Sequence, residues 1–225
     1  MSLLIAMLMP ALGKARLSAR ESQCAANMRQ ATVAFVAFAN DSAQYFPDFS
    51  LDPRTGKQAP DPPYWFRGYW RNRMQQYGLG RDMWYSPSNH RWNRDDFYIW
   101  ANGDPNTAEL VAGYFYFGST LTSSAGFTAA LTNPPASGLK PFPRRNGDLA
   151  DTDILWTDLN RQLGNHIGVW LTPGDPNRWG SNHFYGNGDQ IPDGSHTAHI
   201  DNHVDWTPGR ELHLQSTYSS VHMYW

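Results

Sequence analysis

The segment 17–38, "LSARESQCAANMRQATVAFVAF", contains the pattern that decides the fold. Its apolar residues recur at spacings of seven, four, three, four and three, at Leu17, Cys24, Met28, Ala31, Phe35 and Phe38. Residues with these spacings lie on one face of an α-helix, and an apolar face of this kind packs against a globular domain. The segment therefore predicts an amphipathic helix with one buried side.

The same helix is predicted to be longer than the domain that covers it. Good helix formers run from residue 3 to residue 39, with Pro10 and Gly13 as the exceptions, and the polar residues 40–42 end the run. A helix over residues 11–39 would be about 43 Å long at a rise of roughly 1.5 Å per residue. One end should therefore project. The apolar run "LLIAMLMPAL" at 3–12 favours the N-terminal end, with at most a kink at Pro10.

The charges around this apolar run indicate what kind of segment it is. Lys14, Arg16 and Arg20 follow it, whereas a secretory signal carries its basic residues before the apolar part. The run is also too short for a bilayer, which takes about 20 apolar residues. The sequence therefore predicts neither a signal peptide nor a complete anchor, but the second half of a longer apolar helix.

The remainder of the chain predicts a β-rich domain with long loops. We expect strands in 111–120 ("VAGYFYFGST"), 153–159 ("DILWTDL") and 166–173 ("HIGVWLTP"), a short helix within 64–80, and an extended segment closed by a turn at 82–89. Residues 121–150 and 173–195 should be mostly loop. The predicted fold is α+β, with a helical part at 1–40 packed on an antiparallel β-sheet domain at 41–225.

Composition excludes one class of partner and one kind of cross-link. The net charge is −2 and the pI about 6.4, so no basic surface for nucleic acid is expected. The single cysteine, Cys24, cannot form a disulfide within the chain. Because it lies on the apolar face of the helix, we expect a buried and unreactive thiol in apolar surroundings.

The segment 196–206, "HTAHIDNHVDW", allows two interpretations. As one straight strand it would place alternate residues on one face, and this face would suit zinc: His199, Asp201, His203 and Asp205. As a hairpin turning at Asp201-Asn202 it would pair His199 with Val204 and send His199 and His203 to opposite faces. Asp and Asn tolerate the positive φ of a tight turn, and strand-like residues flank them on both sides. We therefore favour the hairpin.

Three other sites are weaker hypotheses. The loop "GNGDQIPDG" at 186–194 offers Asp189 and Asp193 as calcium ligands. The aromatic cluster at 64–70 could stack on sugars and would make the domain a cell-surface carbohydrate-binding module: Tyr64, Trp65, Tyr69 and Trp70. A metal-dependent hydrolase would use His183, His199 and Asp201. The sequence contains none of the common catalytic motifs, so we expect a protein that is not an enzyme.

Two separated parts of the chain resemble the prepilin-type N-terminal family, in the version found in planctomycete-related bacteria. "LLIAMLMPALGKARLSARESQCAANMRQ" (3–30), followed by "YFPDF" (45–49), resembles the second half of the family's N-terminal segment. The family's C-terminal motif, of the type "NH…G…GGNVLFADGHVEW", is similar to 181–183, Gly194 and 196–206 here. An alternative alignment uses His183 and Asp193-Gly194. "DMWYSPSN" is similar to "FYCPSD", with Ser86 where cysteine is common.

The resemblance implies a structural subunit of a pseudopilus or pilus-like filament, in a type II secretion or type IV pilus-like system. The subunit would lie in the bacterial inner membrane, with its domain in the periplasm or at the cell surface. Its partners would be other copies, the inner-membrane assembly machinery and the bilayer, and it would need no cofactor. The assembly residues would be Leu3, Leu4, Ile5, Leu8, Pro10 and Leu12. The sequence as it stands lacks the leader, the cleavage site and the first half of the apolar helix, so a prepilin peptidase could not process it.

Overall fold

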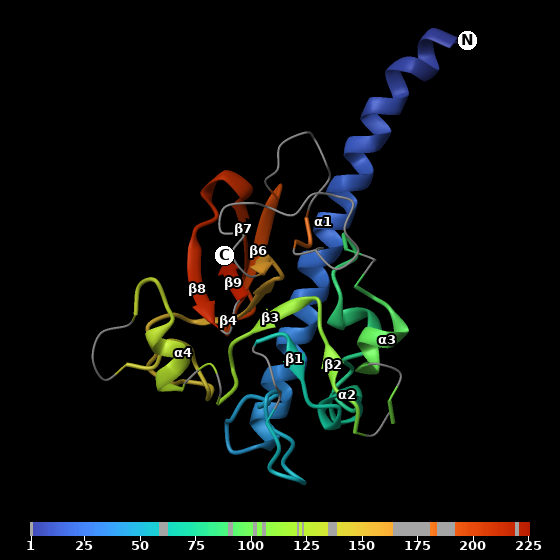
Figure 1. Ribbon diagram of the computed structural model, residues 1–225. Coiled ribbons are helices and arrows are strands. Elements are labelled where there is room, and N and C mark those ends of the chain that lie inside the picture. The colour runs from blue at the N-terminus through green and yellow to red at the C-terminus, as the bar shows by residue number, and fades with distance from the viewer. Residues whose placement is uncertain are drawn as a thin grey trace.

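The protein is an α+β structure in which one long N-terminal helix packs against antiparallel sheets, as predicted (Figure 1). The computed structural model describes residues 2–58, 63–89, 92–100, 103–104, 107–120, 122, 124–134, 139–163, 181–183, 192–218 and 221–225. The strand expected at 166–173 lies outside these residues. Within them, β-strands and short helices follow the long helix.

The long helix α1 spans Ser2–Asp41 and contains Pro10 without interruption. It ends where the polar residues after Ala39 predicted its end. Its N-terminal part extends away from the domain (Figure 1), and the side chains of residues 9–16 are exposed. Cys24, Met28, Ala31, Phe35 and Phe38 are buried, whereas Leu17 is only half-buried. The domain therefore covers the helix from Cys24 onward.

Two antiparallel sheets form the C-terminal half of the domain. The larger has the strand order β3-β4-β6-β7, with β3 at Tyr114–Tyr116, β4 at Ile154–Asp158, β6 at Gly194–His199 and β7 at Val204–Pro208. The smaller has the order β5-β9-β8, with β5 at Arg161–Leu163, β8 at Leu214–Tyr218 and β9 at Val221–Tyr224. The sheet order makes β4 and β6 neighbours although residues 159–193 separate them in sequence.

The middle of the chain is less regular than predicted. The helix expected within 64–80 is reduced to α2, Tyr69–Gln75, because Trp65–Phe66 form strand β1 and pair with β2, Leu110–Val111. The strand expected at 111–120 is split into β2 and β3, and the segment expected to be extended at 82–89 begins inside the 3₁₀ helix η1, Arg81–Trp84. Short helices α3 (Asp95–Tyr98) and α4 (Ala125–Ala129) and the 3₁₀ helix η3 (Gly209–Glu211) complete the described elements.

Aromatic rings join α1 to the larger sheet. Phe35 is fully buried and contacts Phe49, Tyr116 and Trp156 edge to face, with ring centroids 5.4, 5.1 and 5.2 Å away. Such pairs contribute about 0.5–1.5 kcal/mol each beyond the buried area. Nε1 of Trp156 also donates to Oγ1 of Thr32 at 3.2 Å. The buried face of α1 is thus held to β4 by packing and by a hydrogen bond.

The hairpin predicted at 196–206 exists, but its register and its loop differ from the prediction. β6 pairs with β7 through Ala198↔Val204, and the N–H of His199 donates to the carbonyl of His203 at 3.1 Å. The loop has three residues, 200–202, and ends on Asn202 at φ 73°. This is a turn followed by a left-handed residue, a common three-residue hairpin connection. Because the register moves by one residue, His199 and His203 share a face, and the prediction of opposite faces is wrong.

The left-handed conformation of Asn202 leads to a stability prediction. We expect Asn202→Gly to be neutral or slightly stabilising, because glycine adopts positive φ without steric cost. Asn202→Val should lower the free energy of unfolding by about 1–2 kcal/mol, since a β-branched side chain clashes there. Urea unfolding of the three proteins measures both effects. A valine variant as stable as the parent would contradict the assigned turn.

Candidate functional site

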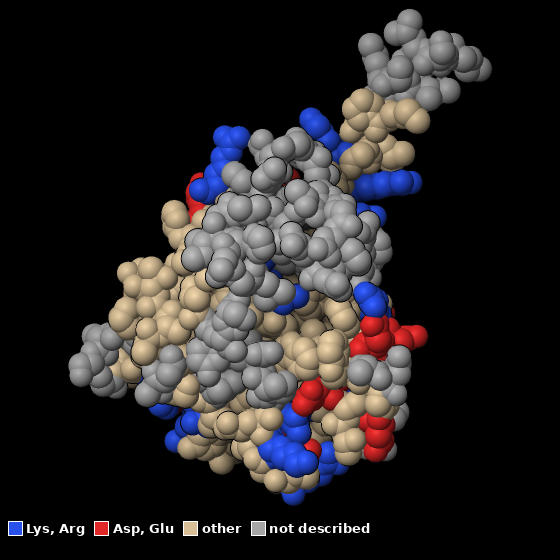
Figure 2. Space-filling model, in the orientation of Figure 1, with Lys and Arg blue, Asp and Glu red and all other residues tan. Residues whose placement is uncertain are grey.

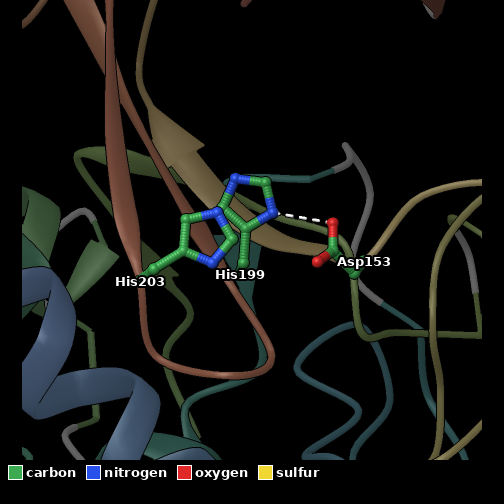
Figure 3. A group of neighbouring side chains, drawn as sticks. All are labelled: Asp153, His199 and His203. Carbon is green, nitrogen blue, oxygen red and sulfur yellow. Dashed lines mark hydrogen bonds and ion pairs between the residues drawn. The ribbon is translucent and has the colours of Figure 1, made fainter.

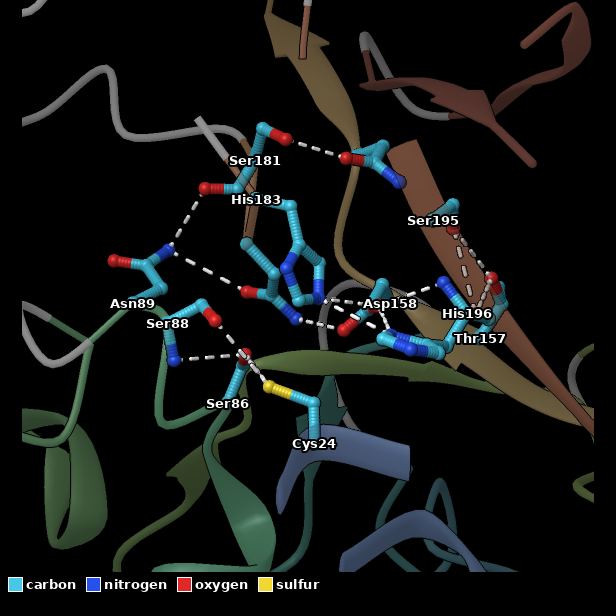
Figure 4. Close-up of polar contacts among 12 residues, drawn as sticks. Cys24, Ser86, Ser88, Asn89, Thr157, Asp158, Ser181, His183, Ser195 and His196 are labelled. Atoms are coloured by element: carbon cyan, nitrogen blue, oxygen red, sulfur yellow. Dashed lines mark hydrogen bonds and ion pairs between the residues drawn. The ribbon is translucent and has the colours of Figure 1, made fainter. Parts of the chain in front are cut away.

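A buried group of one carboxylate and two imidazoles lies where β4 meets β6 (Figure 4). Oδ2 of Asp158 is 2.9 Å from Nε2 of His183 and 3.0 Å from Nδ1 of His196. The backbone N–H of His196 donates to the same oxygen at 2.7 Å. The side chains of Asp158 and His183 are completely buried. An aspartate at this depth is stabilised only by donors that satisfy it, and this group provides them.

The second oxygen of Asp158 is satisfied from another segment. Nδ2 of Asn182 donates to Oδ1 of Asp158 and to the carbonyl oxygen of Gly113, both at 2.7 Å. Nδ2 of Asn89 donates to the carbonyl oxygen of Ser181 at 3.2 Å. The Asp158 carboxylate therefore accepts hydrogen bonds from two parts of the chain, 182–183 and 196, and Asn182 joins this group to the start of β3.

Trp206 covers the two imidazoles from the adjacent strand β7. Its ring centroid lies 5.0 Å from that of His183 and 4.7 Å from that of His196. Gly194 is required for this arrangement, because a Cβ there would be 2.2 Å from Cζ2 of Trp206. The glycine thus lets the indole pack directly on the imidazoles.

Asp158 and His183 hold each other in charged form. Burial alone would raise the pKa of Asp158, but the charges and hydrogen bonds of His183 and His196 hold that pKa well below its usual range. Burial alone would lower the pKa of His183, but the charge and hydrogen bond of Asp158, with a hydrogen bond to Cys24, raise it well above its usual value. Asp158 and His183 therefore form a buried ion pair.

Cys24 is buried, as predicted, but its surroundings are polar. Sγ of Cys24 lies 3.0 Å from Oγ of Ser86 and 3.4 Å from Oγ of Ser88. A hydrogen bond with Cys24 is also among the causes that raise the pKa of His183, so this cysteine connects α1 to the Asp158 group. The expectation of apolar surroundings is wrong, because the segment 86–89 presents hydroxyls to this position of the helix.

A cavity of about 340 Å³ lies between α1 and the β6–β7 hairpin on the side of His196. Glu21 and Arg29 of α1 line it together with His196 and Trp206. Among the described residues, it shares no lining residue with a second cavity of about 370 Å³, which residues within 82–87 and Asn93 form with Gln23 and Asn27.

A second group of histidines and carboxylates lies at the tip of the β6–β7 hairpin (Figure 3). One ligand atom from each of Asp153, His199 and His203 lies within 4.8 Å of the others. The imidazoles of His199 and His203 stack with centroids 3.8 Å apart and an angle of 13° between their planes. Nδ1 of His199 is 2.7 Å from Oδ1 of Asp153, which lies just before β4. Asp205 follows His203 by two residues, so its side chain lies on the same face of the hairpin, near both rings.

Asp201 completes this surface group. It accepts hydrogen bonds from the backbone N–H of His203, at 3.0 Å, and from Nδ1 of the same residue. The backbone hydrogen bond, followed by the side-chain one, lowers the pKa of Asp201. The hydrogen bond to Asp201 raises the pKa of His203. The turn aspartate therefore orients the His203 ring.

The residues predicted for assembly all lie on the projecting part of α1. Pro10 and Leu12 are exposed, and Leu12 keeps 55 % of its surface in solvent. Leu3, Leu4, Ile5 and Leu8 lie on the same helix, but their side chains are outside the described residues. Among the described residues, no helix has both the length and the apolar content of a membrane span.

The weaker hypotheses receive little support from the placement of their residues. Asp189 is outside the described residues, so the calcium hypothesis stays a prediction that rests on Asp193. Tyr64 and Trp70 are buried in the core, and only Trp65 and Tyr69 of the aromatic cluster are partly accessible for a sugar.

His183, which the sequence suggested as a ligand only for a hydrolase site with His199 and Asp201, lies instead beside His196 and Asp158. Sequence reasoning missed Asp158 and His196. The one available signal was an aspartate at the end of a predicted buried strand, since buried aspartates are rare without partners.

Comparisons of the chain with protein-family models, with curated proteins and with solved structures give no match. The resemblance to the prepilin-type family therefore rests on the sequence motifs alone, and the function is inferred from the geometry of the described residues.

Proposed function

We propose that this protein is a structural subunit of a pseudopilus or pilus-like filament, assembled from the inner membrane through its N-terminal helix. The observation that carries the proposal is the projection of α1. A helix of 40 residues is about 60 Å long. The domain buries it only from Cys24 onward. Several uncovered turns of helix do not stabilise a single globular protein. A subunit that packs against other copies with this helix, in contrast, requires the uncovered turns.

The surface of the projecting part supports the same role. Met9 and Leu12 are 69 % and 55 % exposed, and exposed apolar groups of this kind mark interaction surfaces. Lys14, Arg16 and Arg20 are exposed next to them, and Figure 2 shows basic side chains on the helix where it leaves the domain. An apolar end followed by basic residues suits contact with lipid chains and with anionic headgroups.

The proposal predicts that the full chain self-associates in buffer without detergent and that Met9→Asp with Leu12→Asp prevents it. Burying one aliphatic side chain contributes about 1.5–3 kcal/mol, so the double variant should weaken association by at least about 100-fold. Deleting residues 1–13 should likewise give a monomer with the same fold. Size-exclusion chromatography with light scattering measures the mass of each protein.

Leu149→Asp is the matched control. Leu149 is 83 % exposed but lies on the domain, so its substitution should leave the association unchanged. Flotation with anionic vesicles should follow the same order, with the parent and Leu149→Asp bound and the helix variants free. A parent protein that is monomeric and does not bind the vesicles would refute assembly through this helix.

A further inference from the structure

We propose that the tip of the β6–β7 hairpin binds one divalent transition-metal ion, best fitted by zinc. The ligands are Nε2 of His199, Nε2 of His203 and a carboxylate oxygen of Asp205. This site is independent of the projecting helix and of the buried Asp158 group.

The position of Asp205 defines the ligand set. Its Oδ2 lies 3.5 Å from Nε2 of His199 and 3.3 Å from Nε2 of His203. The two Nε2 atoms therefore lie beside a common carboxylate oxygen, and a turn of the His203 ring would bring all three atoms around one ion. Two imidazole nitrogens and one carboxylate oxygen are a ligand set typical of zinc, and three protein ligands leave a position for water.

The other nitrogen of each imidazole is already oriented by a carboxylate. Nδ1 of His199 is 2.7 Å from Asp153, and Nδ1 of His203 hydrogen-bonds Asp201. A histidine that binds a metal through one nitrogen commonly donates its other N–H to a carboxylate, which fixes the tautomer. Nδ1 of each ring thus contacts a carboxylate, which leaves each Nε2 available for the ion; Figure 3 shows this contact for His199 and Asp153.

Charge and access favour the same site. Asp153, Asp201 and Asp205 surround two imidazoles, so the group carries an excess of negative charge that attracts a cation. The side chains of His203 and Asp205 are 44 % and 66 % exposed, so an ion can enter from solvent. The rings are nearly parallel, and the exposed ring of His203 must turn for its lone pair to meet the ion. The backbone is pre-arranged, because the N–H of Ile200 donates to the carbonyl of Asp153 at 3.0 Å.

The buried group of Asp158, His183 and His196 is less suited to an ion. Its side chains are enclosed, and Asp158 already accepts hydrogen bonds on both oxygens. The surface group and the buried group can be distinguished by substitution.

The test is titration calorimetry of the full chain, free of any polyhistidine tag, with ZnCl₂, and absorption spectroscopy with CoCl₂. We expect one zinc ion per chain and a visible Co²⁺ spectrum of low-symmetry nitrogen and oxygen coordination. His199→Ala and His203→Ala should each weaken zinc binding by at least about 100-fold. Asp153→Asn, which removes an orienting carboxylate, should weaken it by about 10–100-fold. Calcium and magnesium should compete poorly, because they prefer ligand sets made of oxygen.

His213→Ala is the matched control, because His213 is exposed and belongs to neither group. It should bind zinc like the parent. Circular dichroism of every variant verifies that the fold is intact. The proposal is overturned if the folded parent does not bind zinc, if the double variant of His199 and His203 still binds it, or if His196→Ala abolishes binding while His199→Ala does not.

Discussion

Asp158→Ala is expected to lower the free energy of unfolding by about 3–5 kcal/mol, the usual cost of removing one partner of a buried ion pair. The substitution leaves the imidazolium of His183 without its counter-charge. It also leaves the N–H of His196 and the amide of Asn182 without the acceptor that both now use. Chemical unfolding followed by tryptophan fluorescence measures the loss.

Asp151→Ala is the control for this prediction. Asp151 is exposed, and surface substitutions of this kind usually change stability by less than about 0.5 kcal/mol. If both variants lose the same small amount, the Asp158 group contributes no more than a surface aspartate.

The same ion pair makes stability depend on pH in a defined direction. The depressed pKa of Asp158 contributes stability that is present above about pH 3.9 and is lost as the pH falls toward the folded-state pKa. The raised pKa of His183 contributes stability that is fully present below about pH 6.5 and is lost as the pH rises through the folded-state pKa. In unfolding experiments on the parent, the contribution of this ion pair to the free energy of unfolding should therefore be greatest between about pH 3.9 and about pH 6.5.

Asp158→Asn removes the negative charge of the side chain but keeps its shape. Without the carboxylate, burial favours neutral His183. The contribution of His183 to the free energy of unfolding should therefore increase, instead of decrease, as the pH rises past about 6.5. The stability difference between parent and variant should therefore shrink from pH 6 to pH 8. His203, which also has a raised pKa, is present in both proteins and cancels in the comparison. A difference that stays constant with pH would mean that His183 is neutral in the parent.

Ser86→Cys is expected to form a disulfide with Cys24 and to raise the free energy of unfolding by about 2–4 kcal/mol. Oγ of Ser86 is 3.0 Å from Sγ of Cys24, so a sulfur at that position needs only a small shift to reach bonding distance. The two residues are 62 positions apart, and closing so long a loop restricts the unfolded chain strongly. Thiol titration after mild oxidation counts the free cysteines, and unfolding with and without reductant measures the gain.

The reduced form of the same variant is its own control, since it has identical side chains and no cross-link. Ser86→Ala shows what the loss of the hydroxyl costs by itself. Two free thiols per chain after oxidation would contradict the geometry at this contact.

The long helix could be predicted from sequence because its signal is local. Spacings of three, four and seven residues identify the buried face of α1 without reference to any other segment, and all but Leu17 of those residues are buried. The hairpin was predictable in position but not in register. Asn202 tolerates positive φ in a two-residue turn and in a three-residue turn alike, and the choice between them reverses the faces of His199 and His203.

The buried Asp158 group could not be predicted in this way. Its members come from the end of β4, from the segment 181–183 and from β6; the order β3-β4-β6-β7 brings the two strands together, and bridges to Asn160 and Gly194 place the segment 181–183 beside them. No spacing along the chain encodes that order. Cys24 shows the same limit, because a helical pattern identifies a buried position but not the hydroxyls of Ser86 and Ser88 that face it.

The contacts that bury α1 also determine the order in which the protein can fold. Trp156 packs on Phe35 and donates to Thr32 across 124 residues of chain, and His183 and β6 come later still. Contacts this distant in sequence close slowly. During synthesis α1 leaves the ribosome well before the strands that bury it, so its apolar face stays exposed until those strands have been made. A chaperone or a membrane surface that holds the helix during this interval would therefore raise the yield of folded protein.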